Sequence, residues 1–244
     1  MRAIVTAAGS GIGKHITKKL RERGDVVFGC DIQEELLDGA GVQADVSDEA
    51  SVDNMMAAAL DQLGGIDLLV NVAGVAGPTG GVEELILDDW RRCLAVTLDG
   101  SFLCSRKAVP HMKRQGAGLI VNFSSTAGMF GYPGRSPYAT AKWGIIGFTK
   151  SLAMELGPHG IRANAICPGA VSGDRMDRVI ASEAEASGRR PEEIQEIYER
   201  STSLRGFVSA DDVANMVLFL ASPGGAMISG QAIAVDGHTE YLTG

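Results

Sequence analysis

Residues 2–23 read RAIVTAAGSGIGKHITKKLRER, and this stretch decides the fold. The β-branched run Arg2 to Thr6 is typical of a strand, and residues 12–23 carry apolar side chains at helical spacing. The turn between them, AAGSGIG, is rich in small residues, as it must be if backbone is to approach a phosphate closely. The free N–H groups of a first helical turn bind such a group. The stretch predicts strand, glycine turn and helix with a phosphate site, although a glycine turn can also serve packing alone.

An acidic residue ends the next predicted strand, residues 25–30. Asp31 follows the glycine turn at about the 20-residue separation at which a carboxylate accepts hydrogen bonds from an adenosine ribose. The same charge repels a 2′-phosphate, and neither Ser10 nor the two residues after Asp31 are basic. This pattern favours NAD over NADP. The alternative is that Asp31 caps the weakly helical run that follows it.

The alternation of strands and helices continues along the chain. We expect further strands at 41–46, 66–74, 119–124, 161–166 and 231–236, and helices at 47–63, 87–115, 136–156 and 210–221. Unbroken apolar runs such as IDLLVNVAG indicate strands buried on both faces. The sequence therefore predicts an α/β protein: a single-domain Rossmann fold whose doubly wound, parallel, seven-stranded sheet has helices on both faces. Ligands bind such folds at the carboxyl ends of the strands.

The segment 172–205 differs from the rest of the chain. It is highly charged and contains two weak helical patterns that break at Gly188 and Pro191. An ordinary solvated excursion would look similar. Because the segment directly follows the Pro168-Gly169 turn at a strand end, we expect it to be a substrate lid. Its arginines, any of which could meet a carboxylate, are Arg175, Arg178, Arg189 and Arg190.

Residues 124–144, SSTAGMFGYPGRSPYATAKWG, contain the candidate chemistry. Tyr138 and Lys142 lie four residues apart, so on a helix they share one face. A free phenol loses its proton only near pH ~10, and a nearby cation lowers that pKa. Ser125 ends the preceding strand, and a Gly/Pro loop lets it return towards Tyr138. Most Tyr/Lys pairs at this spacing are surface packing, but a hydroxyl, a phenol and an ammonium together suit proton transfer at an alcohol or carbonyl.

Composition excludes several classes of function. The chain has 244 residues and a net charge of −8, which disfavours nucleic acid because phosphates reward clustered Lys and Arg. No apolar run reaches the length of a membrane span, and the N-terminal residues lack the pattern of a signal peptide. We expect a cytoplasmic, metal-free protein. The cysteines, expected to be buried and reduced, and the histidines, which lack metal-ligand spacing, are Cys30, Cys93, Cys104 and Cys167, and His15, His111, His159 and His238.

Taken together, these motifs resemble the short-chain dehydrogenase/reductase family over essentially the whole chain. The matching pieces are TAAGSGIG (6–13), ADV (44–46), NVAG (71–74), Ser125, YATAK (138–142), IRANAICPG (161–169) and GQAIAVDG (230–237). The resemblance implies that Tyr138 is the acid/base, that Lys142 lowers its pKa and holds the nicotinamide ribose, and that Ser125 binds the substrate oxygen. It also implies a homodimer or homotetramer built on long helices. The implied cofactor contacts are Gly9, Ser10, Gly11, Ile12, Gly13, Asp31, Asp45, Val46, Asn71, Ala73, Gly74, Tyr138, Lys142, Pro168, Gly169 and Val171.

Three positions depart from the family pattern. Ala7 replaces the first glycine of the turn, which is tolerable if its φ is negative and Gly9 supplies the flexibility. Thr97 replaces the family's catalytic Asn, and we expect it to pack rather than to carry protons, with its hydroxyl bonded to its own preceding turn. Gly173 occupies a common Thr position near the carboxamide, where the adjacent Ser172 could substitute.

The function that follows is an NAD-dependent oxidoreductase that interconverts a secondary alcohol and a ketone by hydride transfer. One alternative is a 3-oxoacyl-thioester reductase, which shares the motifs but usually prefers NADPH and needs a basic surface for its acidic carrier. An alternative of another class is a non-catalytic dinucleotide-binding sensor, which loss of Tyr138 or Lys142 would favour; both are present.

Overall fold

The computed structural model describes residues 1–37 and 39–241. Parallel strands form one seven-stranded sheet in the order β3-β2-β1-β4-β5-β6-β7. The order reverses between β1 and β4, as a doubly wound sheet requires. The strands are β1 (Arg2–Thr6), β2 (Val26–Asp31), β3 (Gly41–Gln43), β4 (Leu68–Asn71), β5 (Gly118–Phe123), β6 (Ile161–Pro168) and β7 (Ala232–Val235).

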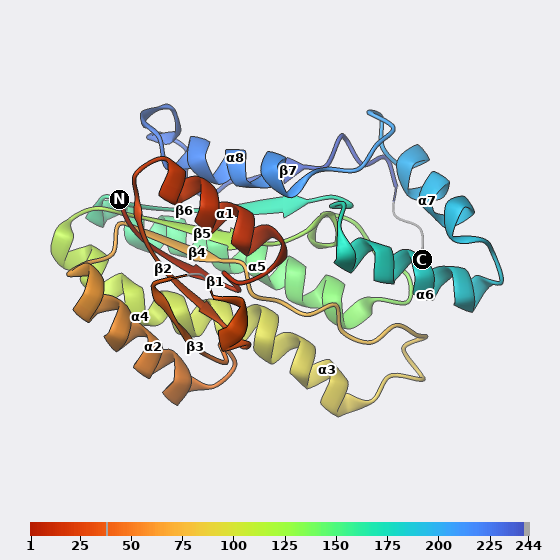
Figure 1. The fold of residues 1–244 in the computed structure, drawn as a ribbon, viewed down its shortest axis with the longest axis horizontal. Helices are drawn as coiled ribbons and strands as arrows, with labels where there is room; N and C mark the ends of the chain where they lie inside the picture. Colours follow the sequence, from red (N-terminus) through yellow and green to blue (C-terminus); the bar gives the residue numbers. More distant parts are fainter. Residues whose placement is uncertain (38, 242–244) are drawn as a thin grey trace.

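Helices cover both faces of this sheet. Figure 1 shows α1 and α8 on one side and α2, α3 and α4 on the other. The helices are α1 (Gly11–Glu22), α2 (Glu49–Leu63), α3 (Leu87–Leu94), α4 (Gly100–Gln115), α5 (Ser136–Leu156), α6 (Asp174–Ser187), α7 (Pro191–Arg200) and α8 (Ala210–Leu220). A membrane-crossing helix, long and apolar throughout, is not found among the described residues.

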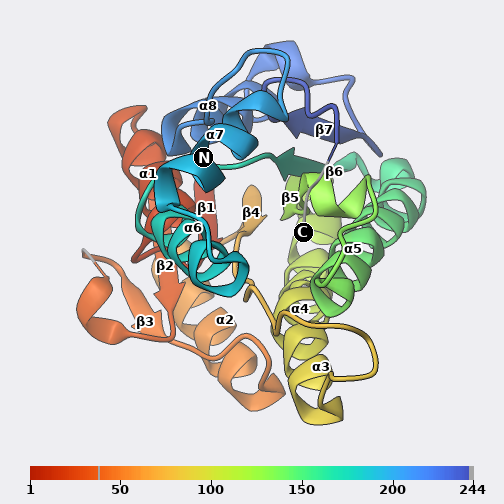
Figure 2. The ribbon, with the colours of Figure 1, turned by 90° about the vertical axis from the view of Figure 1, so that its right-hand side faces the viewer.

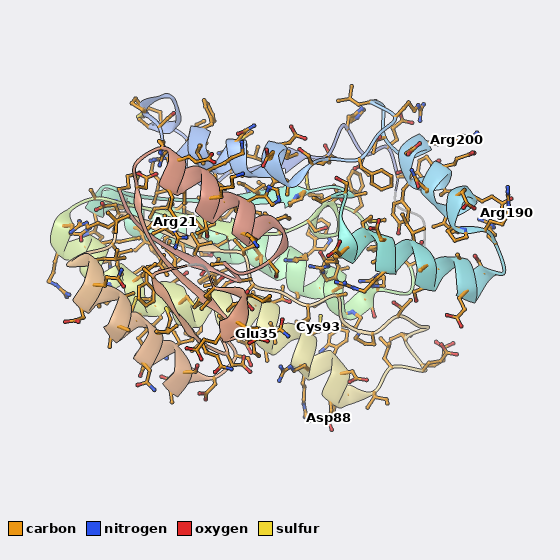
Figure 3. The ribbon with its side chains drawn as sticks, in the orientation of Figure 1. Arg21, Glu35, Asp88, Cys93, Arg190 and Arg200 are labelled. Carbon is orange, nitrogen blue, oxygen red and sulfur yellow. The ribbon has the colours of Figure 1, made fainter. Side chains whose placement is uncertain are left out.

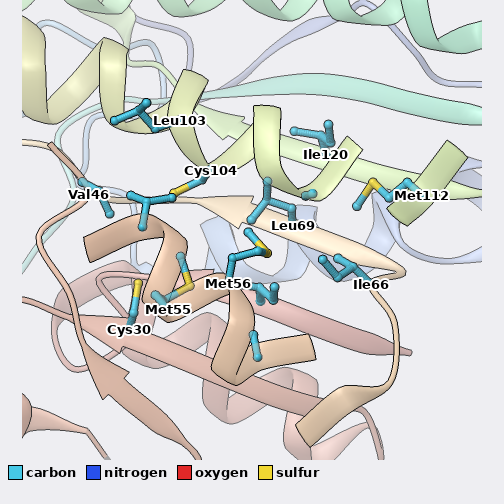
Figure 4. Close-up of a cluster of buried hydrophobic side chains, with 14 of the residues drawn as sticks. Cys30, Val46, Met55, Met56, Ile66, Leu69, Leu103, Cys104, Met112 and Ile120 are labelled. Atoms are coloured by element: carbon cyan, nitrogen blue, oxygen red, sulfur yellow. The ribbon is translucent and has the colours of Figure 1, made fainter. Parts of the chain in front are cut away.

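Each face of the sheet has its own hydrophobic core. On one face, apolar strand residues pack against α2, α4 and α5, and Figure 4 shows Leu69 and Ile120 of the sheet beside Met55 of α2 and Cys104 of α4. On the other face, Ile16 of α1 and α8 side chains cover the sheet. These buried faces explain the continuous apolar runs of the central strands. The four cysteines are buried and free, as predicted.

The carboxyl ends of the strands form the edge at which ligands bind in this fold. The glycine turn follows β1 and the residues NVAG begin at the end of β4, so both lie where the strand order reverses. The Thr6 hydroxyl ties the two loops together by accepting the Val72 N–H at 2.9 Å and the Ala73 N–H at 3.0 Å. Figure 2, which looks onto this edge, shows α6 lying across it.

The predicted elements are all present, and their differences from the prediction lie mainly at their ends. The third strand ends at Gln43, so Asp45 lies two residues beyond it rather than at its end. The predicted helical region 87–115 is continuous, but residues Ala95–Asp99 form a π-helical segment. Such segments arise from packing and often mark functional sites. The segment 172–205 contains α6 and α7, broken at the predicted Gly188 and Pro191.

The expectation for Ala7 was wrong. Its φ is 51°, in the left-handed region, and the flexible glycine of the turn is Gly11 (φ 47°) rather than Gly9. The geometry of the turn demands the left-handed conformation whichever residue is present. An alanine there costs roughly 1–2 kcal/mol because its Cβ crowds the following carbonyl.

We predict that Ala7→Gly stabilises the protein by about 1 kcal/mol, because the relief of this strain exceeds the extra entropy that glycine gains on unfolding. For a chain of this length, that corresponds to a rise in melting temperature of about 2–4 °C by calorimetry. Ala8→Gly is the matched control, since Ala8 is buried without a positive φ and should lose stability. A lower melting temperature for Ala7→Gly would contradict the strain argument.

Candidate active site

The helix α5 brings Tyr138 and Lys142 together at the carboxyl edge. It begins at Ser136 with a proline in its first turn, as helix N-termini favour. Lys142 is only 4% exposed, and its ammonium donates to the Phe123 carbonyl at 2.7 Å. Its Nζ lies 5.6 Å from the centre of the Tyr138 ring. The last carbonyl of β5 thus holds the ammonium beside the phenol.

Ser125 faces the phenol because the loop after β5 packs tightly on α5. A Cβ at Gly128 would lie 2.3 Å from Ser124 Oγ and 2.7 Å from the Lys142 carbonyl oxygen, so only glycine fits there. The Ser125 hydroxyl accepts the Ala127 N–H at 3.2 Å, and it also lowers the pKa of the Tyr138 phenol. The three predicted side chains therefore lie together, drawn from two elements.

The electrostatics of the site prepare Tyr138 to give up its proton. Burial alone would raise the pKa of the Tyr138 phenol, but the charges of Lys142 and Arg175 and the hydrogen bond with Ser125 outweigh it, so the pKa is lowered. Burial also lowers the pKa of the Lys142 ammonium, and the phenol opposes that shift. A phenol with a lowered pKa is what proton transfer near neutral pH requires.

Thr97 lies beside this group, and the expectation that its hydroxyl bonds its own preceding turn was wrong. Its hydroxyl accepts the Val75 N–H at 3.4 Å, and its carbonyl accepts the Ser101 hydroxyl at 3.0 Å. A Cβ at Gly74 would lie 3.4 Å from Thr97 Oγ1 and 3.5 Å from Lys142 Nζ, so both groups border Gly74. Thr97 is the central residue of the π-helical segment Ala95–Asp99.

We predict that Thr97→Val changes turnover by only a few-fold but destabilises the protein by roughly 1–3 kcal/mol, because the Val75 N–H loses its acceptor. Steady-state kinetics and chemical unfolding measure the two effects. A folded variant that binds cofactor normally and turns over about 100-fold more slowly would instead place the hydroxyl in a proton relay. Thr97→Asn is the companion variant: a faster rate would mean that Thr weakens the relay.

Two arginines that surround Tyr138 were not assigned to the site from the sequence. The Arg135 guanidinium lies 5.4 Å from the centre of the Tyr138 ring, and Arg175 of α6 acts electrostatically on both Tyr138 and Lys142. The available signal was that Arg135 lies only three residues before Tyr138, immediately ahead of the helix that carries it. Cys93 borders the same group; burial raises the pKa of its thiol, against the charges of Lys142 and Arg135.

The glycine turn fits a dinucleotide pyrophosphate. A Cβ at Gly13 would lie 2.0 Å from the Ala7 carbonyl oxygen, so only glycine fits there. A Cβ at Gly11 would meet nothing within 4 Å, so the space beside Gly11 is open to a ligand. Ser10 precedes α1, and its side chain makes no bond to the first helical turn, which leaves its hydroxyl and the N–H groups of Ile12 and its neighbours for a ligand.

Asp31 lies at the end of β2 beside this turn. Its carboxylate accepts the Gly9 N–H at 3.1 Å and the Gln33 N–H at 3.2 Å, and it is 7% exposed. Asp31 thus braces the glycine turn instead of capping a helix: the 3₁₀ turn Glu34–Leu36 has Gln33 in the capping position. A fixed charge at this strand end suits a ribose and opposes a 2′-phosphate.

The remaining predicted contacts border the same edge, but some of their side chains already form hydrogen bonds within the protein. Asp45 Oδ1 accepts the Ser47 hydroxyl at 2.6 Å, and Val46 is buried. The Asn71 amide donates to Asn122 at 2.8 Å inside the core, which leaves its main chain for a ligand. Ser172 donates to the Val208 carbonyl at 3.3 Å. The other positions on the edge are Ala73, Gly74, Pro168, Gly169 and Val171.

Comparison with known proteins decides the family. The model of a family described as Enoyl-(Acyl carrier protein) reductase matches residues 6–238. The chain belongs to the short-chain dehydrogenase/reductase family. A curated relative, the 2-(R)-hydroxypropyl-CoM dehydrogenase of Xanthobacter autotrophicus, is 35% identical over 254 residues, with 96% of each chain covered. As a member of this family the chain is an oxidoreductase that uses a nicotinamide dinucleotide.

Solved members of the short-chain dehydrogenase/reductase family share the whole fold. An actinorhodin polyketide ketoreductase with NADPH superposes with a TM-score of 0.92 at 33% identity, covering 96% of this chain and 95% of that one. A xylitol dehydrogenase with bound NAD⁺ gives a TM-score of 0.90 at 28% identity, covering 96% of each. Both cofactors thus occur among close structural neighbours, so the choice between them depends on residues such as Asp31.

Proposed function

We propose that this protein is an NAD-dependent dehydrogenase that interconverts a secondary alcohol and a ketone. The observation that carries the proposal is the half-buried Tyr138 phenol, which lies beside the Lys142 ammonium and whose pKa is lowered because Lys142, Arg175 and Ser125 outweigh the effect of burial. That arrangement suits a proton acceptor for an alcohol. A nicotinamide bound at the carboxyl edge supplies the hydride chemistry.

The residues divide the proton chemistry between them. In the oxidative direction Tyr138 accepts the hydroxyl proton of the substrate, and Ser125 donates to the substrate oxygen as its charge changes, a stabilisation of the oxyanion-hole type. Lys142 keeps the phenolate favourable and offers its remaining N–H groups to the ribose. In the reductive direction Tyr138 returns the proton to the ketone oxygen.

The choice of NAD rests on Asp31. Its carboxylate is fixed by two backbone N–H groups at the end of β2, where the adenosine ribose binds in this fold. A 2′-phosphate would meet that charge directly. The experiment that tests the proposal is NADH formation measured with a panel of secondary alcohols, including sugar acids, hydroxy acids, steroids and cyclic alcohols. Binding of NADH without turnover of any alcohol or ketone would favour the non-catalytic sensor instead.

A 3-oxoacyl-thioester reductase remains the second candidate, because the matching family model carries an acyl-carrier description. Such a reductase needs a basic surface for an acidic carrier, and this chain has a net charge of −8. We therefore favour a small-molecule alcohol. Faster turnover of an acyl-carrier thioester with NADPH than of any free alcohol with NAD would reverse that order.

We further infer that residues 172–205 are a lid and that the protein is a cytoplasmic homodimer or homotetramer. The lid has a small apolar core of its own, and its Tyr198 hydroxyl lies 3.2 Å from that of Tyr132 in the loop before α5. Slower proteolysis of residues 172–205 with NADH and a ketone bound would support the lid, and equal cleavage with and without them would count against it.

The oligomer is inferred from exposed apolar side chains on two long helices. Exposed Phe102 of α4 and Met154 of α5 favour a helix-mediated interface, which a monomer in light scattering would contradict.

A further inference from the structure

We propose that the substrate carries an anionic group, a carboxylate or a sulfonate, which Arg135 and Arg175 bind beside Tyr138. This inference rests on the proposed function and adds the class of substrate to it. Arg135 is the residue immediately before α5 and stands 5.4 Å from the centre of the Tyr138 ring, whereas Arg175 belongs to α6 of the lid and acts on the phenol through its charge.

The Arg135 side chain is held in place, but not all of its N–H donors have hydrogen-bond partners. It is 8% exposed, and its guanidinium lies 5.4 Å from the ring centres of both Tyr132 and Tyr138. One nitrogen donates to the Ala76 carbonyl at 2.9 Å, while its Nε is buried without a hydrogen-bond partner. A guanidinium carries five N–H donors, and a buried one is costly unless it is paired.

Arg162, a half-buried arginine in β6, has a different environment. Arg162 donates to the carbonyls of Leu220, Gly225 and Ile228 at 3.0, 2.8 and 3.3 Å. Within residues 1–37 and 39–241, no carboxylate forms an ion pair with Arg135 or Arg175. The groups that act most strongly on Tyr138 are cations and a hydroxyl. This acidic protein thus has cations at its candidate active site that form no ion pair with a described carboxylate, although Glu183 lies behind Tyr132 and Tyr198.

The cofactor phosphates are not the missing partner. The glycine turn that suits them precedes α1, and Figure 2 shows α1 and α5 on opposite sides of the carboxyl edge. Two of the other lid arginines, Arg190 and Arg200, are poor candidates. Figure 3 shows Arg190 and Arg200 on the outer side of α7, and they pair with Glu193 and Glu196 at 3.2 Å. Arg175 is the lid arginine whose charge reaches Tyr138 and Lys142.

The test compares charged and neutral substrates of the same shape. Short hydroxycarboxylates and hydroxyalkanesulfonates are assayed with NAD beside their carboxamides and sulfonamides. We expect the wild-type protein to prefer the anions in kcat/KM. Arg175→Met should lower kcat/KM for the anions by roughly 10- to 100-fold, since a hydrogen bond to a charged group is lost, and should change the neutral alcohols much less. The anion-to-neutral ratio cancels any effect of Arg175 on the pKa of Tyr138, which both substrates share.

Two further variants complete the test. Arg190→Met removes a lid arginine that is paired away from the site and should leave the ratio unchanged. Arg135→Met should lower the ratio as Arg175→Met does; if it fails to fold, the exposed Arg175 decides the matter. Which of the two anion series is preferred identifies the anion. Neutral alcohols oxidised as well as anions, or equal losses for both in Arg175→Met, would overturn the inference alone. Oxidation of no alcohol of either kind would overturn the proposed function itself.

Discussion

Tyr138→Phe should lower turnover by roughly 10²- to 10⁴-fold, the range typical of a lost general acid or base. NADH binding should stay close to that of the wild-type protein. The ring and its packing remain, and only the proton path is removed. Steady-state rates and fluorescence titration with NADH separate the two effects. Near-full activity would mean that another base acts and that the candidate site is misassigned.

Lys142→Met extends this test through the pH profile. The ammonium lowers the pKa of Tyr138, so without it that pKa rises. Alcohol oxidation needs the phenolate and should therefore increase with pH through a more alkaline range in the variant than in the wild-type protein. Cofactor affinity should also fall, because Lys142 is the group expected to hold the ribose. Ser125→Ala is the matched control: it should slow turnover with little loss of cofactor affinity.

The sequence predicted the fold well because the hydrophobic pattern agrees with the glycine and proline residues that begin and end the helices and strands. The bounds of α5, Ser136–Leu156, are those predicted, since a proline opens this helix and Gly157-Pro158 ends it. The order of motifs along the chain also predicted that Ser125, Tyr138 and Lys142 lie at one edge of the sheet. These features were predictable because residues close together in the sequence determine them.

The features that the sequence did not reveal depend on tertiary packing. The positive φ of Ala7 follows from the turn that joins β1 to α1, and alanine itself gives no sign of it. The π-helical segment Ala95–Asp99 interrupts a stretch whose sequence pattern predicts continuous helix, so the pattern gave no sign of it. The assignment of Arg175 to the site, in preference to three other lid arginines, required the position of α6. In the candidate site, therefore, the clustering of Ser125, Tyr138 and Lys142 was predictable, whereas the groups around them were not.

The remaining large effect concerns the cofactor. We predict that the wild-type protein prefers NAD over NADP by roughly 100-fold or more in kcat/KM, because a 2′-phosphate beside the Asp31 carboxylate faces a like-charge repulsion of several kcal/mol and loses the ribose hydrogen bond. Asp31→Ala combined with Ile32→Arg should narrow or reverse this preference. Ile32 is 51% exposed, so an arginine there displaces no core packing.

The control for this change follows from the second role of Asp31. Its carboxylate also accepts the Gly9 N–H, so Asp31→Ala loosens the glycine turn and should reduce efficiency with both cofactors. Asp31→Asn keeps an acceptor for that N–H while it removes the charge, so with Ile32→Arg it should shift the preference towards NADP with a smaller loss of overall rate. Titration of each variant with NADH and NADPH separates binding from turnover. Equal efficiency of the wild-type protein with NAD and NADP would show that the Asp31 charge does not face the 2′ position, and the assignment of NAD would then fail.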